Sequence, residues 1–399
     1  MKLCKSYIFI MLLGSFSLFA CGEDETETTG STDTIEAGSE AGSEAGSEAG
    51  SEAGSEAGSQ AGSQAGSPNS ETPAVTADST YQVLANEDVI YAEGLGHDDT
   101  SMSPFAIPLY LDLYYPDNDS TDRPVYMFIH GGGFTGGTKT KPEIVEMANY
   151  YTSRGWVFAS IDYRTTEELC DSERMPLCEG KIRDMNREEV LAFYAGIASR
   201  EWIENAMEGA ESIKNLQQAI AMYAAQRDAK AALRWIVANA NTYGINKDFI
   251  TVGGASAGAI TTIALGISNQ ENFRDEISVD EDATLSTTNL NETYDVKSMI
   301  YFWGSNVKLE LFESVYGVNL YDSSDPELFM AHGTDDRNPS TAFSEATELQ
   351  GIYESLGVYN ELIPLEGKDH GAWNAKVDGK GLSEMSFDFI VSRQNLTVE

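Results

Sequence analysis

The chain has 399 residues, and acidic side chains outnumber basic ones so strongly that the formal net charge at pH 7 is −39. Such a charge repels nucleic acids and other polyanions, so we expect no nucleic-acid partner. The region 81–399 is long enough for one large domain with a substantial core.

The first twenty residues have the composition of an export signal. Lys2 and Lys5 give a basic start, and 7–20 is a mostly apolar run. This run is shorter than the roughly 20 residues of a membrane-spanning helix, as is typical of a signal peptide. The signal ends in Leu-Phe-Ala-Cys, which resembles a bacterial lipobox, so Cys21 is the expected lipidation site. We expect an exported domain anchored to an inner or outer membrane; the alternative is an ordinary secretory signal.

Residues 21–80 are expected to form a disordered tether. The sequence Glu-Ala-Gly-Ser repeats between Glu36 and Ser67, with Gln replacing Glu in the last two copies. The repeat has no large apolar side chain that could form a core, and its regular glycines oppose a helix. Such a flexible linker would separate the anchored end of the chain from the domain at 81–399.

From residue 107 onward, apolar runs alternate with helical patterns. Leucines at every second position of 107–115 predict a half-buried strand, and 125–129 and 157–161 are short apolar strands. Further strands are expected at 249–252, 296–303, 328–331 and 361–364, and helices at 233–240, from 257, and at 341–356. This order predicts an α/β fold with a mainly parallel sheet, helices on both faces and an early antiparallel edge strand.

Two segments exceed this plan. Residues 165–227 are a long, charged, helix-prone insertion, and 268–295 are acidic with few candidate core residues. Loops that follow the carboxyl ends of strands can overhang a site. We therefore expect 165–227 to form a helical cap or rim that shapes substrate access.

Cys170 and Cys178 lie in this insertion, and Cys4 and Cys21 are the other cysteines of the chain. In an exported protein, the pair most simply forms one disulfide, with reduced, buried thiols as the alternative. The spacing does not resemble a zinc site, and we expect no metal or organic cofactor.

The strongest local motif is Gly-Ala-Ser-Ala-Gly at 254–258, between a predicted strand and a predicted helix of small residues. A nucleophile on such a tight turn needs small neighbours because the backbone is strained and closely packed. Ser256 is therefore the candidate nucleophile.

The second motif is His-Gly-Gly-Gly-Phe at 130–134, directly after the strand at 125–129. Glycines allow the backbone to approach a ligand and to direct N–H groups at it. Such N–H groups stabilise the oxyanion that forms in acyl transfer. We expect this loop to contribute to an oxyanion hole.

A serine nucleophile needs a base and an acid that orients it. His370 follows the last predicted strand and is the candidate base. Each other histidine has a less suitable position: before the sheet, in the glycine loop, and at a strand end (His97, His130 and His332). The loop after the strand at 328–331 offers Asp335 and Asp336 as orienting acids, and their position alone does not separate them.

Five segments together resemble the carboxylesterase and hormone-sensitive-lipase-like group of α/β-hydrolases. They are HGGGF at 130–134, IDYR at 161–164, GINKDFITVGGASAGA at 244–259, HGTDD at 332–336 and DHGAW at 369–373. The resemblance covers about residues 85–395. It implies an α/β-hydrolase fold and hydrolysis of carboxylic esters through an acyl-enzyme. It also implies Asp336 as the acid and, as oxyanion donors, the N–H groups of Gly132, Gly133 and Ala257.

The chain departs from the family pattern at two places. Ala255 precedes the serine where relatives often have an acidic residue, and Arg-Asn-Pro at 337–339 replaces an apolar pair before proline. The second departure weakens the choice of Asp336 over Asp335.

Two other functions are kept as alternatives: a serine peptidase of the prolyl-oligopeptidase type, and a non-catalytic adhesion module on the same fold. The expected partner is a small-molecule or polymeric ester, such as a short acyl ester, an acetylated or feruloylated polysaccharide, or a polyester. Phe134, Trp373 and the 165–227 insertion are candidates for the pocket lining.

Overall fold

The computed structural model describes residues 72–97, 103–169, 176–306, 312, 315 and 320–399. The signal segment, Cys21, the repeat, Cys170 and the side chain of Cys178 lie outside the described residues, so the expectations for them stay predictions. Within the described ranges, no helix is both long and apolar enough to span a bilayer.

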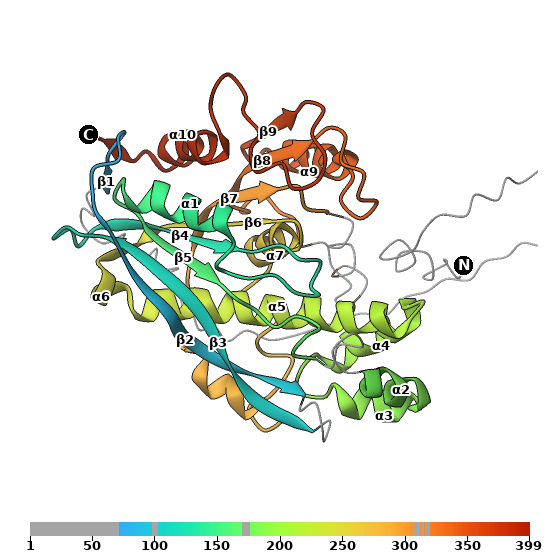
Figure 1. The fold of residues 1–399 in the computed structure, drawn as a ribbon. Coiled ribbons are helices and arrows are strands. Elements are labelled where there is room, and N and C mark those ends of the chain that lie inside the picture. The colour runs from blue at the N-terminus through green and yellow to red at the C-terminus, as the bar shows by residue number, and fades with distance from the viewer. Residues whose placement is uncertain (1–71, 98–102, 170–175, 307–311, 313–314, 316–319) are drawn as a thin grey trace, which may run out of the picture. The chain divides into compact units, whose positions relative to one another are not determined.

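One eight-stranded sheet organises the domain, in the order β2-β3-β5-β4-β6-β7-β8-β9 (Figure 1). The β2–β3 and β3–β5 pairs are antiparallel, and all pairs from β5 to β9 are parallel. The predicted α/β class is confirmed, but the strand expected at the edge, 107–115 within β3, lies between β2 and β5, and β2 forms the edge. The strands are β2 (Val83–His97), β3 (Pro104–Pro116), β4 (Arg123–Ile129), β5 (Val157–Ile161), β6 (Ile245–Ala255), β7 (Val296–Phe302), β8 (Glu327–Gly333) and β9 (Asn360–Leu365).

Helices cover both faces of the sheet. α1 (Pro142–Thr152) and α10 (Leu382–Gln394) pack on one face, and α5 (Ile213–Ala238), α7 (Ala257–Ile267) and α9 (Phe343–Leu356) pack on the other (Figure 1). β4 shows why the central strands are mostly apolar. Tyr126 packs against Tyr151 of α1, whereas Met127 belongs to the core beneath α5 and α7. Both faces of such a strand are removed from water, so its side chains are apolar except for Arg123 at its start, which donates to the carbonyls of Tyr243 and Asn118.

The predicted insertion contains three short helices: α2 (Pro176–Asp184), α3 (Arg187–Phe193) and α4 (Arg200–Gly209). Its expected end at residue 227 is corrected, because 213–227 belong to α5, a continuous helix that packs on the sheet. The predicted apolar residues in the last third of α5 are buried, but the rest of the helix has no amphipathic pattern because it is buried on several sides. Two of its charges pair inside the fold: Asp228 with Arg164, and Arg227 with Asp282.

The fold also begins before the expected boundary at residue 81. β1 (Ala74–Val75) pairs in parallel with β10 (Thr397–Val398), and Val75 is buried. The last residues expected to belong to the tether thus lie within the described fold. The remaining short elements are α6 (Ala240–Tyr243) and η2 (Ala283–Thr287).

Candidate active site

Ser256 lies at the turn between β6 and α7, with φ 55° and ψ −120°. Few non-glycine residues adopt such backbone angles, which are strained and often mark functional sites. The flanking glycines are required by close packing: a Cβ on Gly254 would lie 2.3 Å from the carbonyl of Gly258, and one on Gly258 would lie 2.0 Å from Ile129 O. The steric reason expected for the Gly-Ala-Ser-Ala-Gly motif is confirmed.

The structure brings Ser256, His370 and Asp336 together from three separate loops. His370, after β9, places Nε2 3.0 Å from Ser256 Oγ. Its Nδ1 lies 2.8 Å from Oδ2 of Asp336, in the loop after β8. An ionised carboxylate only accepts hydrogen bonds, so Nδ1 carries the hydrogen and Nε2 is free to accept the serine proton. Asp335 is exposed, and its carboxylate accepts a hydrogen bond from the neighbouring Thr334 Oγ1 at 3.5 Å.

Asp336 has a fully shielded side chain that is held by several donors. Burial opposes ionisation, but hydrogen bonds from His332, His370 and the N–H of Asn338 outweigh it and hold the pKa of Asp336 well below its usual value. The distances to Asp336 are 3.0 Å from His332 Nε2 and 2.9 Å from Asn338 N. Asp336 therefore stays ionised and stabilises a positive charge on His370.

The other two histidines have structural contacts. His130 donates from Nδ1 to Gly131 O at 2.8 Å and stacks on Tyr163, with ring centroids 4.4 Å apart. His130 therefore supports the glycine loop. His97 stacks on Phe193 with centroids 3.9 Å apart, and burial lowers the pKa of His97 to about 4.

The glycine loop has a fixed backbone. Gly132 has φ 141° and Gly133 has φ 63°, which favour glycine. The carbonyl of Gly132 accepts from both N–H and Oγ1 of Thr135 at 3.0 Å each. In a trans peptide the next N–H points away from this carbonyl, so Thr135 also sets the direction of the Gly133 N–H. The carbonyl of Gly133 accepts from Gln218 Nε2 at 3.0 Å.

A cavity of about 220 Å³ opens beside Ser256. Gly133 and Ala257 line it, whereas Gly132 does not. Ala257 is the first residue of α7, so no carbonyl within the helix lies four residues earlier to accept a hydrogen bond from its N–H. The other lining residues come from the glycine loop, α5, α7 and the loop after β8: Phe134, Gln218, Ala219, Met222, Ile260, Asn338, Ser340 and Thr341.

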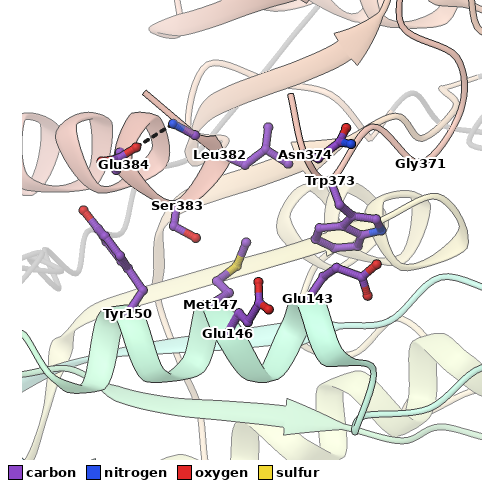
Figure 2. Close-up of a pocket in the computed structure, with 11 residues that line it drawn as sticks. Glu143, Glu146, Met147, Tyr150, Gly371, Trp373, Asn374, Leu382, Ser383 and Glu384 are labelled. Carbon is purple, nitrogen blue, oxygen red and sulfur yellow. Dashed lines mark hydrogen bonds between the residues drawn. The ribbon is translucent and has the colours of Figure 1, made fainter. Parts of the chain in front are cut away.

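Phe134 and the α5 residues line this cavity as expected, but Trp373 lines a different one. That cavity, of about 530 Å³, lies between α1, the loop after His370 and the start of α10. Figure 2 shows Trp373 beside it, with Met147 and Tyr150 projecting from α1. None of the residues that line the Ser256 cavity lines this second one.

Sequence reasoning missed the role of Arg337. Its N–H donates to Asp369 Oδ1 at 3.0 Å, and its Nε donates to Oδ2 at 2.7 Å. Asp369 also accepts from the N–H of His370 at 2.8 Å. The N–H and guanidinium of Arg337, with the N–H of His370, lower the pKa of Asp369 to about 2. Arg337, which departs from the family pattern, thus connects the loop after β8, with Asp336, to the loop after β9, with His370.

The BD-FAE family model matches residues 111–186 and 214–349, more than half of the chain. The chain belongs to this family. The matched ranges contain the glycine loop, Ser256 and Asp336, and they end before His370. A stretch of 110 residues is 33% identical to the non-reducing polyketide synthase pkbA of Emericella nidulans. It covers 27% of this chain, but the chain spans only 4% of that synthase.

Solved structures of esterases have a similar fold. Butyrate-bound Est2 of the planctomycete Thermogutta terrifontis has a TM-score of 0.50 and 17% identity, covering 77% of this chain and 93% of that one. A truncated carbohydrate esterase from gut microbiota has a TM-score of 0.47 and 16% identity, covering 82% and 100%. The fold is that of an α/β-hydrolase. The family and the fold support an ester hydrolase.

Proposed function

We propose that this BD-FAE protein is a serine hydrolase that cleaves carboxylic esters through an acyl-enzyme. One observation carries the proposal. Ser256 Oγ lies 3.0 Å from His370 Nε2, while His370 Nδ1 lies 2.8 Å from the shielded carboxylate of Asp336. This is the geometry of a nucleophile, its base and the acid that orients the base.

In the first half of the reaction, His370 Nε2 takes the proton of Ser256 Oγ as this oxygen attacks the ester carbonyl. Asp336 stabilises the imidazolium that results. The tetrahedral intermediate collapses, the bond to the alcohol oxygen breaks, and His370 gives its proton to the leaving alcohol. The proposed oxyanion donors, which act in both halves of the reaction, are the N–H groups of Gly132, Gly133 and Ala257.

In the second half, His370 removes a proton from water, and the resulting hydroxide attacks the acyl-serine. The second tetrahedral intermediate then releases the carboxylic acid, and the proton on His370 returns to Ser256 Oγ. Water and ester are the only reactants consumed in this scheme.

The cavity favours a short acyl group. Its volume of about 220 Å³ is smaller than the roughly 300–1,000 Å³ of pockets that enclose drug-sized ligands. Its apolar side chains suit an alkyl group: Phe134, Ala219, Met222 and Ile260. Est2 was solved with butyrate, a short carboxylate. We expect the acyl group to occupy this cavity and the alcohol part, small or polymeric, to extend out of it.

The direct test is Ser256→Ala, assayed with p-nitrophenyl acetate, butyrate and octanoate. Removal of the nucleophile should lower kcat by roughly 10⁴-fold or more. A fluorophosphonate probe should label the wild type and not the variant. Unchanged ester turnover in Ser256→Ala would overturn the proposal. A preference for prolyl anilides over esters would favour the peptidase instead, and absence of both labelling and turnover in the wild type would favour the adhesion module.

Export and anchoring remain part of the proposal. The sequence supports lipidation at Cys21, a tether that exposes the domain outside the cytoplasm, and a disulfide between Cys170 and Cys178. Cys21→Ala should release the protein from the membrane fraction and abolish incorporation of labelled palmitate. Retention of both membrane association and label in the variant would contradict this.

A further inference from the structure

Thr341 places its hydroxyl against the hydrogen bond between Asp336 and His370. Thr341 Oγ1 lies 3.0 Å from His370 Nδ1 and 3.2 Å from Asp336 Oδ2. The residue is buried, and it lines the cavity that contains Ser256. The mechanism above makes no use of this hydroxyl.

The chemistry of the neighbours fixes where the hydroxyl hydrogen points. The carboxylate of Asp336 only accepts hydrogen bonds, and Nδ1 of His370 already carries a hydrogen. Thr341 therefore donates its hydrogen to Asp336 Oδ2 and presents a lone pair to the Nδ1–H of His370. This N–H then has two acceptors, Oδ2 at 2.8 Å and the threonine oxygen at 3.0 Å.

The backbone of Thr341 is held by the same cluster. Nε2 of His332 lies 2.8 Å from the carbonyl of Thr341 and 3.0 Å from Asp336 Oδ2. Both oxygens are acceptors, so Nε2 carries a hydrogen and contacts both. The N–H of Thr341 donates to Asn338 O at 3.0 Å, and Asn338 donates its own N–H to Asp336. Thr341 is thus fixed relative to the carboxylate before any substrate binds.

We propose that Thr341 is a positioning residue for the reaction, which holds Asp336 and His370 in the arrangement that directs Nε2 at Ser256. It also gives the imidazolium a second acceptor at Nδ1 when the positive charge forms. Hydrogen bonds to charged groups are stronger than neutral ones, so this contact strengthens in the transition state. The inference rests on the proposed function.

Two variants separate the hydroxyl from the shape of the side chain. Thr341→Val has nearly the same shape without the hydroxyl, and Thr341→Ser keeps the hydroxyl without the methyl group. Thr341→Val should lower kcat for p-nitrophenyl acetate by about 10- to 100-fold, the effect of losing a hydrogen bond to a charged group. KM should change less than about twofold, because the acyl group does not need this hydroxyl to bind. Thr341→Ser should recover most of the loss.

A second readout does not depend on turnover. The NMR signal of the His370 Nδ1 proton should move in Thr341→Val and stay near its wild-type position in Thr341→Ser. Thermal unfolding of both variants checks the fold, and Thr341→Ala is a second hydroxyl-free variant if Thr341→Val does not fold.

Equal losses of kcat in the valine and serine variants would overturn the inference, and so would a valine variant with wild-type kcat and an unmoved Nδ1 signal. Failure of the proposed function would look different. The wild type would then hydrolyse no ester, while the Nδ1 signal would still report whether the hydroxyl orders His370.

Discussion

At the scale of single residues, the sequence points to the proposed reacting groups better than to the residues that hold them. Ser256 stands in a diagnostic local motif, and His370 could be selected by its position after the last predicted strand and by elimination of the other histidines. Asp335 and Asp336 are adjacent, and position alone could not choose between two carboxylates in one loop. In the fold one of them is shielded beside His370 and the other is exposed. Thr341 and Arg337 were missed because their contacts with His370 and Asp369 join segments that are 29 and 32 residues apart in the chain.

The different exposure of Asp335 and Asp336 gives a matched pair of variants. Asp336→Asn should lower kcat by about 10³- to 10⁴-fold, because an amide cannot stabilise the imidazolium and favours the wrong tautomer. Asp335→Asn should change kcat less than about twofold, since its side chain lies outside the site. Steady-state kinetics with p-nitrophenyl acetate measures both. If Asp335→Asn were the impaired variant, the assignment of the acid would be wrong.

At the scale of elements, α5 was the least predictable part of the fold. Only its last third has the apolar spacing of an amphipathic helix, whereas the helix begins at Ile213 and is buried on several sides. From the sequence, its buried charged residues are expected at the surface, because their partners lie in other segments of the chain. Arg227 pairs with Asp282, and Asp228 pairs with Arg164. The consequence for function is direct, because the start of α5 forms one wall of the Ser256 cavity.

Met222 of α5 should limit the length of the acyl group. Met222→Ala removes a long buried side chain from the wall of a small cavity, and the space gained suits a longer chain. We expect the ratio of kcat/KM for octanoate over acetate to rise about 10-fold, the lower end of what one methylene contributes in such pockets. Hydrolysis of a p-nitrophenyl ester series measures the ratio.

Met147→Ala is the matched control for this experiment. Met147 is equally buried but lines the separate cavity beside Trp373 (Figure 2). Each variant should lose about 2–5 kcal/mol of unfolding free energy, as large-to-small changes in cores do. Only Met222→Ala should change the acyl preference. A similar change of acyl preference in Met147→Ala would mean that a general loosening of the fold, and not the wall of the Ser256 cavity, determines the preference.

At the scale of the whole molecule, the parallel sheet was predictable, because its strands are apolar on both faces. The edge strand β2 was not, because its fifteen residues mix exposed and buried positions and include several polar and charged side chains. This strand ends at His97, whose Nε2 donates to the carbonyl of Phe193 at 2.9 Å. One buried histidine thus joins the edge of the sheet to α3.

The burial of His97 makes the stability of the fold depend on pH. Burial disfavours the charged imidazole and lowers the pKa of His97 from its usual 6.5 to about 4. Between these values the unfolded chain binds a proton at this site and the folded chain does not. The contribution of His97 to the unfolding free energy therefore falls as the pH falls from 6.5 to 4. At about 1.4 kcal/mol for each pH unit, the full loss is about 3 kcal/mol.

His97→Gln keeps a donor for the Phe193 carbonyl but cannot titrate. Its unfolding free energy, measured by urea titration at several pH values, should fall less between pH 6.5 and 4 than that of the wild type. Asp325→Asn is a control of opposite sign. Burial raises the pKa of Asp325 from 3.8 to about 7, so the wild-type carboxyl loses stability as the pH rises through that window. The asparagine variant should not lose this stability as the pH rises. Its unfolding free energy should still contain the His97 contribution, which falls between pH 6.5 and 4. Parallel curves for the wild type and His97→Gln would show that the histidine at the end of β2 does not govern acid unfolding.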